Sequence, residues 1–477
     1  MSSNRGACIS RVPAIALFCV LVMPIFSGAQ ADNSGARALT LEDAVSYALQ
    51  HYPAVRASLE ELRAAHAGVS LARAQYLPAL SGVYQDSRAT QNQVPGVWLG
   101  TPITPTVEGP TGVSSGQSYW GSQTAALFSW EPFDFGLRSS MVGQAKSAEA
   151  KSVADAARTH LDVATAVGSY YLMAYAAGLA TQAAAANVNR WQVFNQSVHT
   201  LVENQLRPGV DASRADAQLA LAKTQLYQSQ QVEQNYLATL AALMGIAGTE
   251  IRLIPGDLVS LPSSDSLSSL APSENPLARQ QMATVQQIQA QEKVLSKTDY
   301  PRLFLQGEGF ARGSEVPANG SYIGNWNGLA PARGNWVAGI TVLFPNVFDF
   351  KGLSAQKQIA KAHENSQRAL YDKTIQELTG QAQAAMATLK SAKLIAEQTP
   401  VELAAARQSE NQSKTRYEAS LTTIVEVADA EGLLARAESD DAIARVNVWR
   451  SLFALAAAQG DLQPFLDILK APAHDSP

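Results

Sequence analysis

The stretch Ala74-Gln75-Tyr76-Leu77-Pro78-Ala79-Leu80 marks a change from a helical to a β-prone pattern, and a counterpart occurs later in the chain. That counterpart is Lys297-Thr298-Asp299-Tyr300-Pro301-Arg302-Leu303, about 223 residues further on. In both places a tract rich in Ala or Gln precedes the proline, and residues of higher β-propensity follow it. A helix-to-strand transition that repeats predicts a fold of two similar halves.

Two further landmarks recur in the same order. Phe133-Asp134-Phe135-Gly136 returns as Phe348-Asp349-Phe350-Lys351-Gly352, and Leu240-Ala241-Ala242-Leu243-Met244-Gly245 returns as Leu455-Ala456-Ala457-Ala458-Gln459-Gly460. Both pairs are about 215 residues apart, a register that chance rarely keeps. We therefore expect a first repeat over 32–270, a second over 271–460 and a C-terminal tail over 461–477.

Each repeat is predicted to run helix, strand, loop, strand, long helix, tip, helix. Gly, Pro and Ser are frequent at 88–122 and 312–334, which fits exposed loops between paired strands. The strands alternate only loosely between polar and apolar residues, as is typical of barrel strands with one face in lipid. They are expected at about 79–87 and 123–133 in the first repeat, and at about 302–311 and 335–344 in the second.

Long proline-free tracts follow each pair of strands, at 133–207 and 346–399, and predict long helices. A continuous helix over 137–207 is roughly 100 Å long. Pro400 is expected to kink its counterpart. The shorter helices before the strands and after the tip together nearly match the long helix, so we expect them to stack end to end beside it. Their joints and the C-terminal tail then form a belt outside the bundle.

Residues 1–31 have the pattern of a secretory signal peptide. Arg5 and Arg11 give a basic start, an apolar run follows, and Ala29-Gln30-Ala31 fits a cleavage site. The apolar run is about 15 residues long, too short for a membrane helix of roughly 20. An exported protein is therefore expected.

Both cysteines, Cys8 and Cys19, fall in this leader, so the exported chain is expected to have no disulfides. Lipidation of Cys19 is an alternative. Phe18 disfavours it, because a small residue generally precedes a lipidated cysteine.

The charge balance is acidic, with 36 Lys plus Arg against 41 Asp plus Glu. Loss of the leader makes the net charge about −7, which argues against a nucleic-acid partner. No apolar stretch of about 18 residues is apparent after the leader. Any membrane-spanning part is therefore expected to be β-structure.

Two segments resemble the TolC-type outer-membrane efflux proteins: Leu39-Thr40-Leu41-Glu42-Asp43-Ala44-Val45 with the following Tyr52-Pro53, and the second tip from Tyr417 to Ala430. The resemblance covers essentially the whole mature chain. It implies a mainly α-helical fold with a membrane β-barrel. In such a homotrimer, each chain gives four strands to a twelve-stranded barrel that continues into a periplasmic helical tunnel. The implied location is the outer membrane of a Gram-negative bacterium, with a periplasmic extension.

The resemblance also implies a passive channel in a tripartite efflux or type I secretion system. Its partners would be an inner-membrane transporter and a periplasmic adaptor, or membrane fusion protein, with outer-membrane lipid around the barrel. Four strands alone leave open edges, and a barrel needs about eight or more, so subunits must combine. The alternative is a periplasmic coiled-coil scaffold or adaptor, which the duplicated strands disfavour.

A gate is implied by the same resemblance. Glu426 and Asp429 occupy positions at which the family narrows the periplasmic mouth with acidic side chains. Their spacing places both on one helix face, and a trimer would gather their carboxylates into an entrance that attracts cations. The alternative is a pair of solvated acids on an amphipathic helix.

Gly209-Val210 and Ser420-Leu421 match the paired tips by which the family meets its adaptor. Ser420 replaces the usual glycine, which tolerates a positive φ better. Ordinary helix-to-helix turns are the alternative.

Tyr417 and Thr422 match positions that hold the mouth shut in the family, and Thr422 stands where a basic residue is frequent. Arg214 and Asp216 are the expected substitute partners, or else merely solvated charges.

Signals for catalysis are poor. Gly112-Val113-Ser114-Ser115-Gly116 fits G-x-S-x-G, but a nucleophile elbow needs a strand before it and a helix after it, whereas a loop is predicted here. The six histidines include no pair at metal-ligand spacing, and the sequence has no phosphate-binding loop. We expect no enzyme activity, no cofactor and no metal site.

Overall fold

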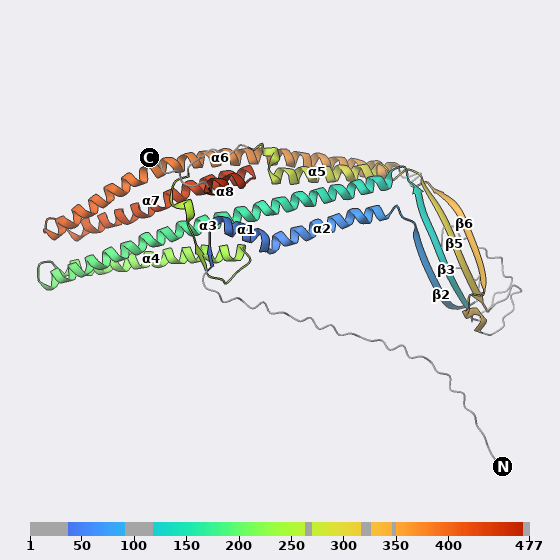
Figure 1. Cartoon of the computed structure of the whole chain (residues 1–477), viewed down its shortest axis with the longest axis horizontal. Coiled ribbons are helices and arrows are strands. Elements are labelled where there is room, and N and C mark those ends of the chain that lie inside the picture. The colour runs from blue at the N-terminus through green and yellow to red at the C-terminus, as the bar shows by residue number, and fades with distance from the viewer. Residues whose placement is uncertain (1–36, 91–117, 263–269, 316–325, 346–349, 471–477) are drawn as a thin grey trace, which may run out of the picture.

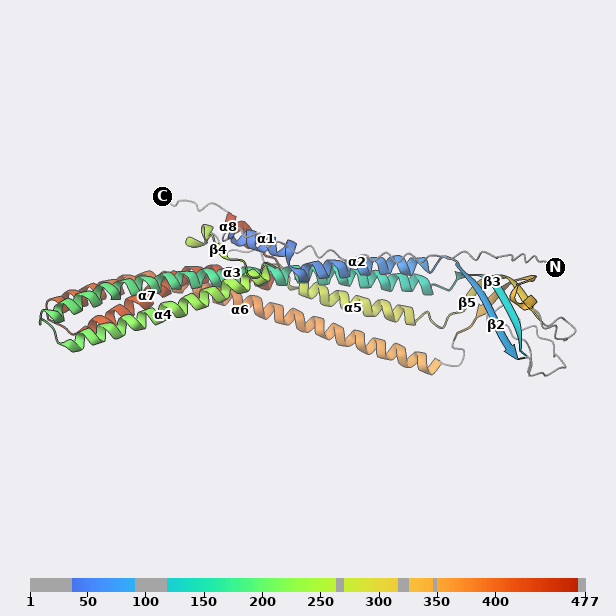
Figure 2. The same cartoon turned by 90° about the horizontal axis from the view of Figure 1, so that it is seen from below.

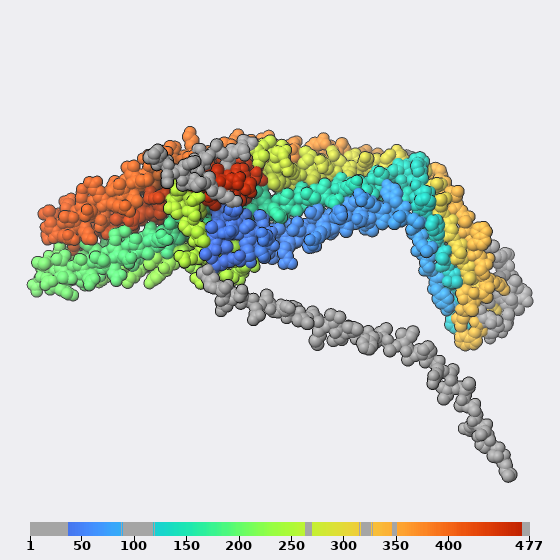
Figure 3. All heavy atoms as spheres, in the orientation of Figure 1, coloured from blue at the N-terminus to red at the C-terminus, as the bar shows by residue number. Residues whose placement is uncertain are grey.

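A computed structural model describes residues 37–90, 118–262, 270–315, 326–345 and 350–470. The predicted leader with both cysteines, and the loop that carries Ser114, lie outside these residues. The described chain is an elongated bundle of helices with a four-stranded sheet at one end, and the sheet is inclined to the bundle (Figures 1 and 3).

The two halves of the chain share the order helix, strand, strand, long helix, helix, and each has further short elements of its own. The first half comprises β1 (Arg37–Leu39), α1 (Leu41–His51), α2 (Pro53–Ala74), β2 (Ala79–Thr90), β3 (Ser118–Phe133), α3 (Leu137–Glu203), α4 (Gly209–Leu243), β4 (Ile251–Leu253) and η1 (Gly256–Val259). The second comprises η2 (Pro272–Glu274), α5 (Pro276–Leu295), β5 (Arg302–Ser314), η3 (Trp326–Leu329), β6 (Arg333–Leu343), α6 (Phe350–Glu418), α7 (Ile424–Gln459) and α8 (Gln463–Lys470).

The helices are arranged as rods in a curved wall. Helix α3 has 67 residues, and α4 with 35 and α2 with 22 both pack along it. Helix α6 has 69 residues and is lined in the same way by α7 and α5. Contacts of α3 with α5 and α7 join the two halves, so that α2 and α4 form one edge of the wall and α6 the other (Figure 1). Pro400 lies inside α6, which continues on both sides of it.

Proline and capping residues fix where the short rods begin. Pro53 and Pro276 occupy the first turns of α2 and α5, where the missing N–H costs no helical hydrogen bond. The Asn275 side chain caps α5 by accepting from Leu277 N–H at 2.9 Å. These residues fix the position at which each helix starts, so the preceding segment does not continue into the same helix.

The remaining elements form a belt on one side of the rods, here defined as β1, α1, β4, η1 and α8 (Figure 2). The parallel pair β1–β4 is fastened to α3 by Tyr171, whose hydroxyl donates to the carbonyl oxygens of Ile254 at 2.6 Å and Leu39 at 3.1 Å. On α7, Trp449 Nε1 donates to Ser260 O at 2.7 Å. These bonds fix which faces of α3 and α7 point toward the belt.

The core is centred where the belt meets the rods. Tyr171, Trp449 and Phe465 are fully buried there, among many alanines and valines. Small side chains let the helices approach closely: a Cβ built on Gly168 of α3 would lie 2.3 Å from Cζ of Phe453 on α7. The Phe453 ring is itself held by Phe465, with ring centroids 5.1 Å apart.

The sheet has the order β2-β3-β5-β6 and is antiparallel throughout. Each half supplies one hairpin, and β3 pairs with β5 to join them. Strands β2 and β6 each pair with one other described strand, so each leaves its outer edge open in the single chain.

The two faces of the sheet differ in chemistry. One face carries large apolar side chains that are well exposed, and they alternate along the strands: Leu80, Tyr84, Phe128, Trp130, Trp336, Ile340 and Val342. The other face carries amides, hydroxyls and an acid among apolar residues that include Leu127, Phe304 and Phe310: the polar residues are Gln123, Ser129, Gln306, Glu308 and Thr341. Such alternation suits a sheet that has an apolar medium on one side and water on the other.

A salt bridge anchors the turn from β3 into α3. Asp134 accepts from the backbone N–H groups of Gly136 at 3.0 Å and Arg138 at 2.8 Å, and from Arg138 Nε at 2.6 Å. The Arg138 guanidinium also donates to Gln75 O at 3.2 Å, so the end of α2 joins the same junction. Both charged side chains are buried, and each hydrogen bond therefore counts for more than at the surface.

The expectation that no apolar stretch of about 18 residues follows the leader is wrong. Helix α3 contains an 18-residue window with a mean hydropathy of 1.2, long and apolar enough to cross a membrane by composition alone. Half of that window is buried inside the protein. Many small apolar residues give this window its high hydropathy. They are apolar in a helix outside the membrane because they pack against other helices.

We predict that Gly168→Ala destabilises the protein by about 1–3 kcal/mol, because the added methyl group meets the confined Phe453 ring. Gly143→Ala, in the same helix, is the control: its Cβ meets nothing within 4 Å, so a gain of about 0.5–1 kcal/mol is expected. Equilibrium unfolding followed by circular dichroism compares the two. Equal stabilities would contradict the close contact of α3 and α7.

Candidate functional site

The two helical tips, at the end of the rods away from the sheet, have the same backbone form. Gln205 in the α3–α4 turn and Ser420 in the α6–α7 turn both have φ of 61°. The next residue in each turn, Leu206 or Leu421, donates its N–H to the carbonyl five residues back at 2.8 Å. This bond is the mark of a helix that ends with a left-handed residue. Ser420 therefore adopts the conformation for which glycine is usual.

This geometry changes the expected pairing of the tips. Ser420-Leu421 corresponds to Gln205-Leu206, about 215 residues earlier, in register with the other landmarks. Gly209 and Val210 instead begin α4, beyond the turn. Leu206 and Leu421 are 67% and 70% exposed, so each tip presents a leucine to its surroundings.

Tyr417 links the two tips within the chain. Its side chain is buried, and its hydroxyl donates to Asp211 Oδ2 on α4 at 3.0 Å. Arg207, from the first turn, donates to Tyr417 O, and its guanidinium carbon lies 4.1 Å from the centroid of the tyrosine ring. Phe194 of α3 packs on the ring, with centroids 5.5 Å apart.

The hydroxyl of Tyr417 keeps its proton at physiological pH. Burial and the hydrogen bond to Asp211 raise the pKa of Tyr417 to about 12, above the ordinary 10. A raised pKa means that the stabilisation is complete below pH 10 and is lost only as the pH rises through about 12. The link is therefore independent of pH in the physiological range.

The other gate-linking candidates lie near this contact without joining it. Thr422 is buried, and its hydroxyl has no hydrogen-bond partner among the described residues. Asp216 accepts from Asn195 Nδ2 at 2.8 Å and lies 2.9 Å from His199 Nε2, so it contacts α3 within its own hairpin. Arg214 is exposed on α4. Asp211 and Arg207 hold the position that Asp216 and Arg214 were expected to take.

Glu426 and Asp429 are both exposed on the first turns of α7, just beyond the second tip. They lie on one side of the helix, while Ile424 and Val427 point into the tip core. Their exposure is compatible with an acidic ring and equally with solvated acids.

A partly buried ionic cluster, in which Glu431 is the buried member, separates the tip core from the rest of α7. Arg190 Nε on α3 lies 3.0 Å from Glu431 Oε2, and its Nη1 lies 2.9 Å from Glu438 Oε2. Burial raises the pKa of Glu431 more than the neighbouring Arg190 guanidinium lowers it. Glu410 of α6, a further carboxylate, also raises this pKa. Acids exceed their counter-charges here, so this contact between α3 and α7 is less secure than the apolar core.

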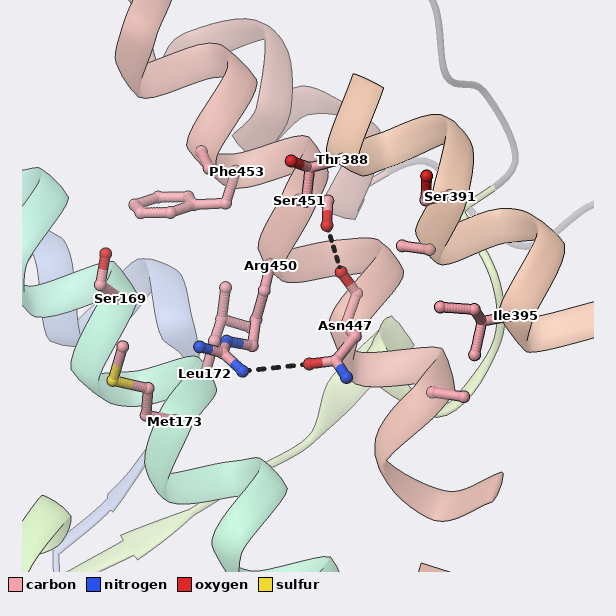
Figure 4. A pocket seen from close by; sticks show the side chains of 13 residues that line it. Ser169, Leu172, Met173, Thr388, Ser391, Ile395, Asn447, Arg450, Ser451 and Phe453 are labelled. Atoms are coloured by element: carbon pink, nitrogen blue, oxygen red, sulfur yellow. Dashed lines mark hydrogen bonds between the residues drawn. The ribbon is translucent and has the colours of Figure 1, made fainter. Parts of the chain in front are cut away.

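A cavity of about 460 Å³ lies among α3, α6 and α7, at the level of the belt (Figure 4). Its walls are mostly apolar, with Leu172 and Met173 from α3 and Ile395 from α6. From α7, Asn447 and Arg450 reach it, and Arg450 Nη1 donates to Asn447 Oδ1 at 3.0 Å.

The chain belongs to the outer membrane efflux protein family, whose model matches residues 44–248 and again 267–461. This confirms the resemblance seen in the sequence, and one match falls in each half of the chain. Protein CyaE of Bordetella pertussis is 28% identical over 437 residues, which are 89% of this chain and 84% of that protein. The protein is therefore an outer-membrane protein of a Gram-negative bacterium, with a periplasmic helical extension.

Solved structures show the same fold. The CmeC outer membrane channel of Campylobacter jejuni is 16% identical with a TM-score of 0.72, over 88% of this chain and 85% of that one. The outer membrane protein VceC of Vibrio cholerae is 17% identical with a TM-score of 0.69, over 88% and 96%. The mainly helical fold predicted from the sequence is confirmed, and one of these structures, CmeC, is that of an outer membrane channel.

We predict that Tyr417→Phe raises the open probability of the channel roughly tenfold or more. The variant keeps the ring packing but leaves the buried Asp211 carboxylate without its hydroxyl donor, at a cost of about 1.5–3 kcal/mol. Single-channel recording measures this. Ser213→Ala, which removes an exposed hydroxyl of α4 close to the same tip, is the control. An unchanged open probability in Tyr417→Phe would show that the tip link does not hold the closed state.

Proposed function

We propose that three copies of the chain form a channel-tunnel that passively conducts solutes from an inner-membrane transporter and a periplasmic adaptor to the exterior. The observation that carries this proposal is the sheet: an apolar, exposed face and two open edges stand at one end of a long helical wall. Family membership supports a channel of the efflux or secretion type.

The open edges of β2 and β6 require partners. Unpaired backbone N–H and C=O groups cost several kcal/mol each in lipid, so a four-stranded sheet cannot stand there alone. Pairing β6 of one copy with β2 of the next closes a barrel without edges, and three copies give the twelve strands implied by the family. The apolar face would then meet lipid and the polar face the lumen.

The helical wall has matching edges. Exposed apolar side chains lie along its first edge, at Leu71 of α2 and at Leu221 and Tyr227 of α4. On α6, Leu394 and Val401 are exposed in the same way. Joining one edge to the other in a ring would bury these side chains, which are unfavourable in water.

We also propose the division of the chain. Residues 1–31 are the signal that exports it, 32–270 and 271–460 are its two repeats, and 461–477 is the tail. The belt outside the tunnel would then mark the periplasmic exterior, and the opposite face of α3 and α7 the lumen. The helical tips would be the end that meets the adaptor.

Glu426 and Asp429 are proposed to ring the periplasmic mouth. Opening would shift the tip helices outward, break the links at Tyr417 and widen this ring. No step forms or breaks a covalent bond, so energy for transport would come from the transporter. A periplasmic scaffold is the alternative, but it leaves the apolar face of the sheet without a purpose.

The decisive measurement is the current through purified protein in planar bilayers. We expect discrete, cation-preferring channels, with cation preference reduced several-fold in the Glu426→Gln/Asp429→Asn variant because the mouth loses its negative charge. Native mass spectrometry of the same preparation should give three chains. The control variant Glu60→Gln changes an exposed acid of α2, far from the tips. Absence of channels in membrane-inserted protein would favour the scaffold. Unaltered cation selectivity in the double variant would contradict the proposal of an acidic ring at the mouth.

Adaptor contact at the tips can be tested by crosslinking. Cysteines placed at Leu206 and Leu421 are expected to form adducts with the periplasmic adaptor in intact cells, because these side chains project from the turns. A cysteine at Val259, exposed on η1 of the belt, is the control. Stronger adducts from Gly209 and Val210 than from Leu206 would show that the start of α4 makes the contact, and no adduct from any tip position would oppose tip docking.

A further inference from the structure

The cavity among α3, α6 and α7 has one charged group in its lining. Arg450 is half-buried, and within the described part of the chain it forms no ion pair. The hydrogen bond to Asn447 uses one of its five N–H donors and supplies no negative charge. A guanidinium beside apolar walls is more stable with an anion than without one.

The polar end of the cavity lies on the side of α7 that does not face the belt. Trp449 of α7 and Tyr171 of α3 point to the belt, where they hydrogen-bond to its carbonyl oxygens. At about 100° of rotation per residue, Asn447 and Arg450 lie well away from Trp449 around α7, and Figure 4 shows the Arg450 side chain beside Leu172 and Met173. Anything bound here is therefore bound on the inner face, if the belt is outside as proposed above.

The sequence of α7 places the same face at the mouth. Asn447 lies three heptads after Glu426, and Arg450 lies three heptads after Asp429. Residues separated by whole heptads share one side of a packed helix. This side of α7 thus carries Glu426 and Asp429 near the tip and Arg450 at the cavity, with the ion pair of Arg436 and Asp440 between them.

The acidic mouth does not cancel the charge at the cavity. About 21 residues of helix separate the two levels, or roughly 30 Å, whereas salt screens charges over about 8 Å. An anion at the cavity therefore meets the field of Arg450 and not that of the acidic mouth.

We propose that this cavity is a transient binding site for amphipathic organic anions, with one carboxylate on an aromatic or alkyl body. The carboxylate would bind the free donors of Arg450, and the body would lie against Met173, Leu172 and Ile395. The volume of about 460 Å³ is within the range of small-molecule sites. The lumenal position of the site rests on the proposed function, whereas its chemistry rests on the residues of the cavity.

The test is titration calorimetry of naphthalene-2-carboxylate into the detergent-solubilised protein, with naphthalene-2-carboxamide as the uncharged comparison. The carboxylate is expected to bind at least about tenfold more tightly than the amide, and Arg450→Gln should remove that difference. Arg436→Gln is the matched control, because Arg436 lies two heptads before Arg450 on the same side of α7 but is 80% exposed and beside Asp440.

A second variant tests the cavity without touching the charge. Ala454 lines the cavity and is exposed, so Ala454→Phe should fill the space without disturbing the core, and should weaken carboxylate binding about tenfold. Equal binding of carboxylate and amide, or full binding by Arg450→Gln or Ala454→Phe, would overturn the site. Calorimetry needs no current, so a protein that binds but forms no channel would refute the proposed function alone. Channels without carboxylate binding would refute the site alone.

Discussion

Close packing against α3 is the constraint on which the rest of the structure depends. One helix of 67 residues contacts α1, α2, α4, α5 and α7, and therefore joins the two repeats, the belt and the tip. Its alanines, together with Gly168, allow these neighbours to approach, and Phe453 of α7 fits against the glycine. Partners shorter than α3 must be stacked in pairs, and the joints between them are where the chain leaves the wall to form the belt. The length of one helix thus dictates the interruption of the others.

Stability is unevenly distributed along the wall. At the belt, Tyr171, Trp449 and Phe465 are buried in a large apolar core. Toward the tips the core becomes smaller and ends at Tyr417, and the ionic cluster of Arg190 and Glu431 separates it from the packing farther along α7. Segments with fewer buried apolar contacts open at lower free-energy cost. The tip helices are therefore the part of the wall best suited to move while the helices at the level of the belt stay packed together.

The sequence predicted the helices and strands more successfully than it predicted the contacts between their side chains. Landmarks about 215 residues apart located the long helices and strands, because proline, alanine content and β-propensity are local properties. The backbone form of the tips could not be predicted from the positions of glycine, because the non-glycine residues Gln205 and Ser420 adopt the left-handed conformation. Arg207 and Asp211 were missed because their partner Tyr417 is distant in sequence. The cavity was equally invisible, since α3, α6 and α7 meet only in the fold.

On α7, the residues that pack in the core and the charged residues lie on different sides of the helix. One helix can therefore hold the wall together and also present charges. Its core face, with Ile424, Val427, Leu434 and Trp449, holds the wall together, while the side opposite the belt carries Glu426, Asp429 and Arg450. Because side chains spaced by heptads remain on their own side, charges there need no burial in the apolar core. The number and sign of these charges can therefore differ between the tip and the level of the belt, while the contacts that hold α3 to α7 stay the same. A solute passing along this side would meet the acids of the tip, then the ion pair of Arg436 with Asp440, and then Arg450, in an order set by helix periodicity.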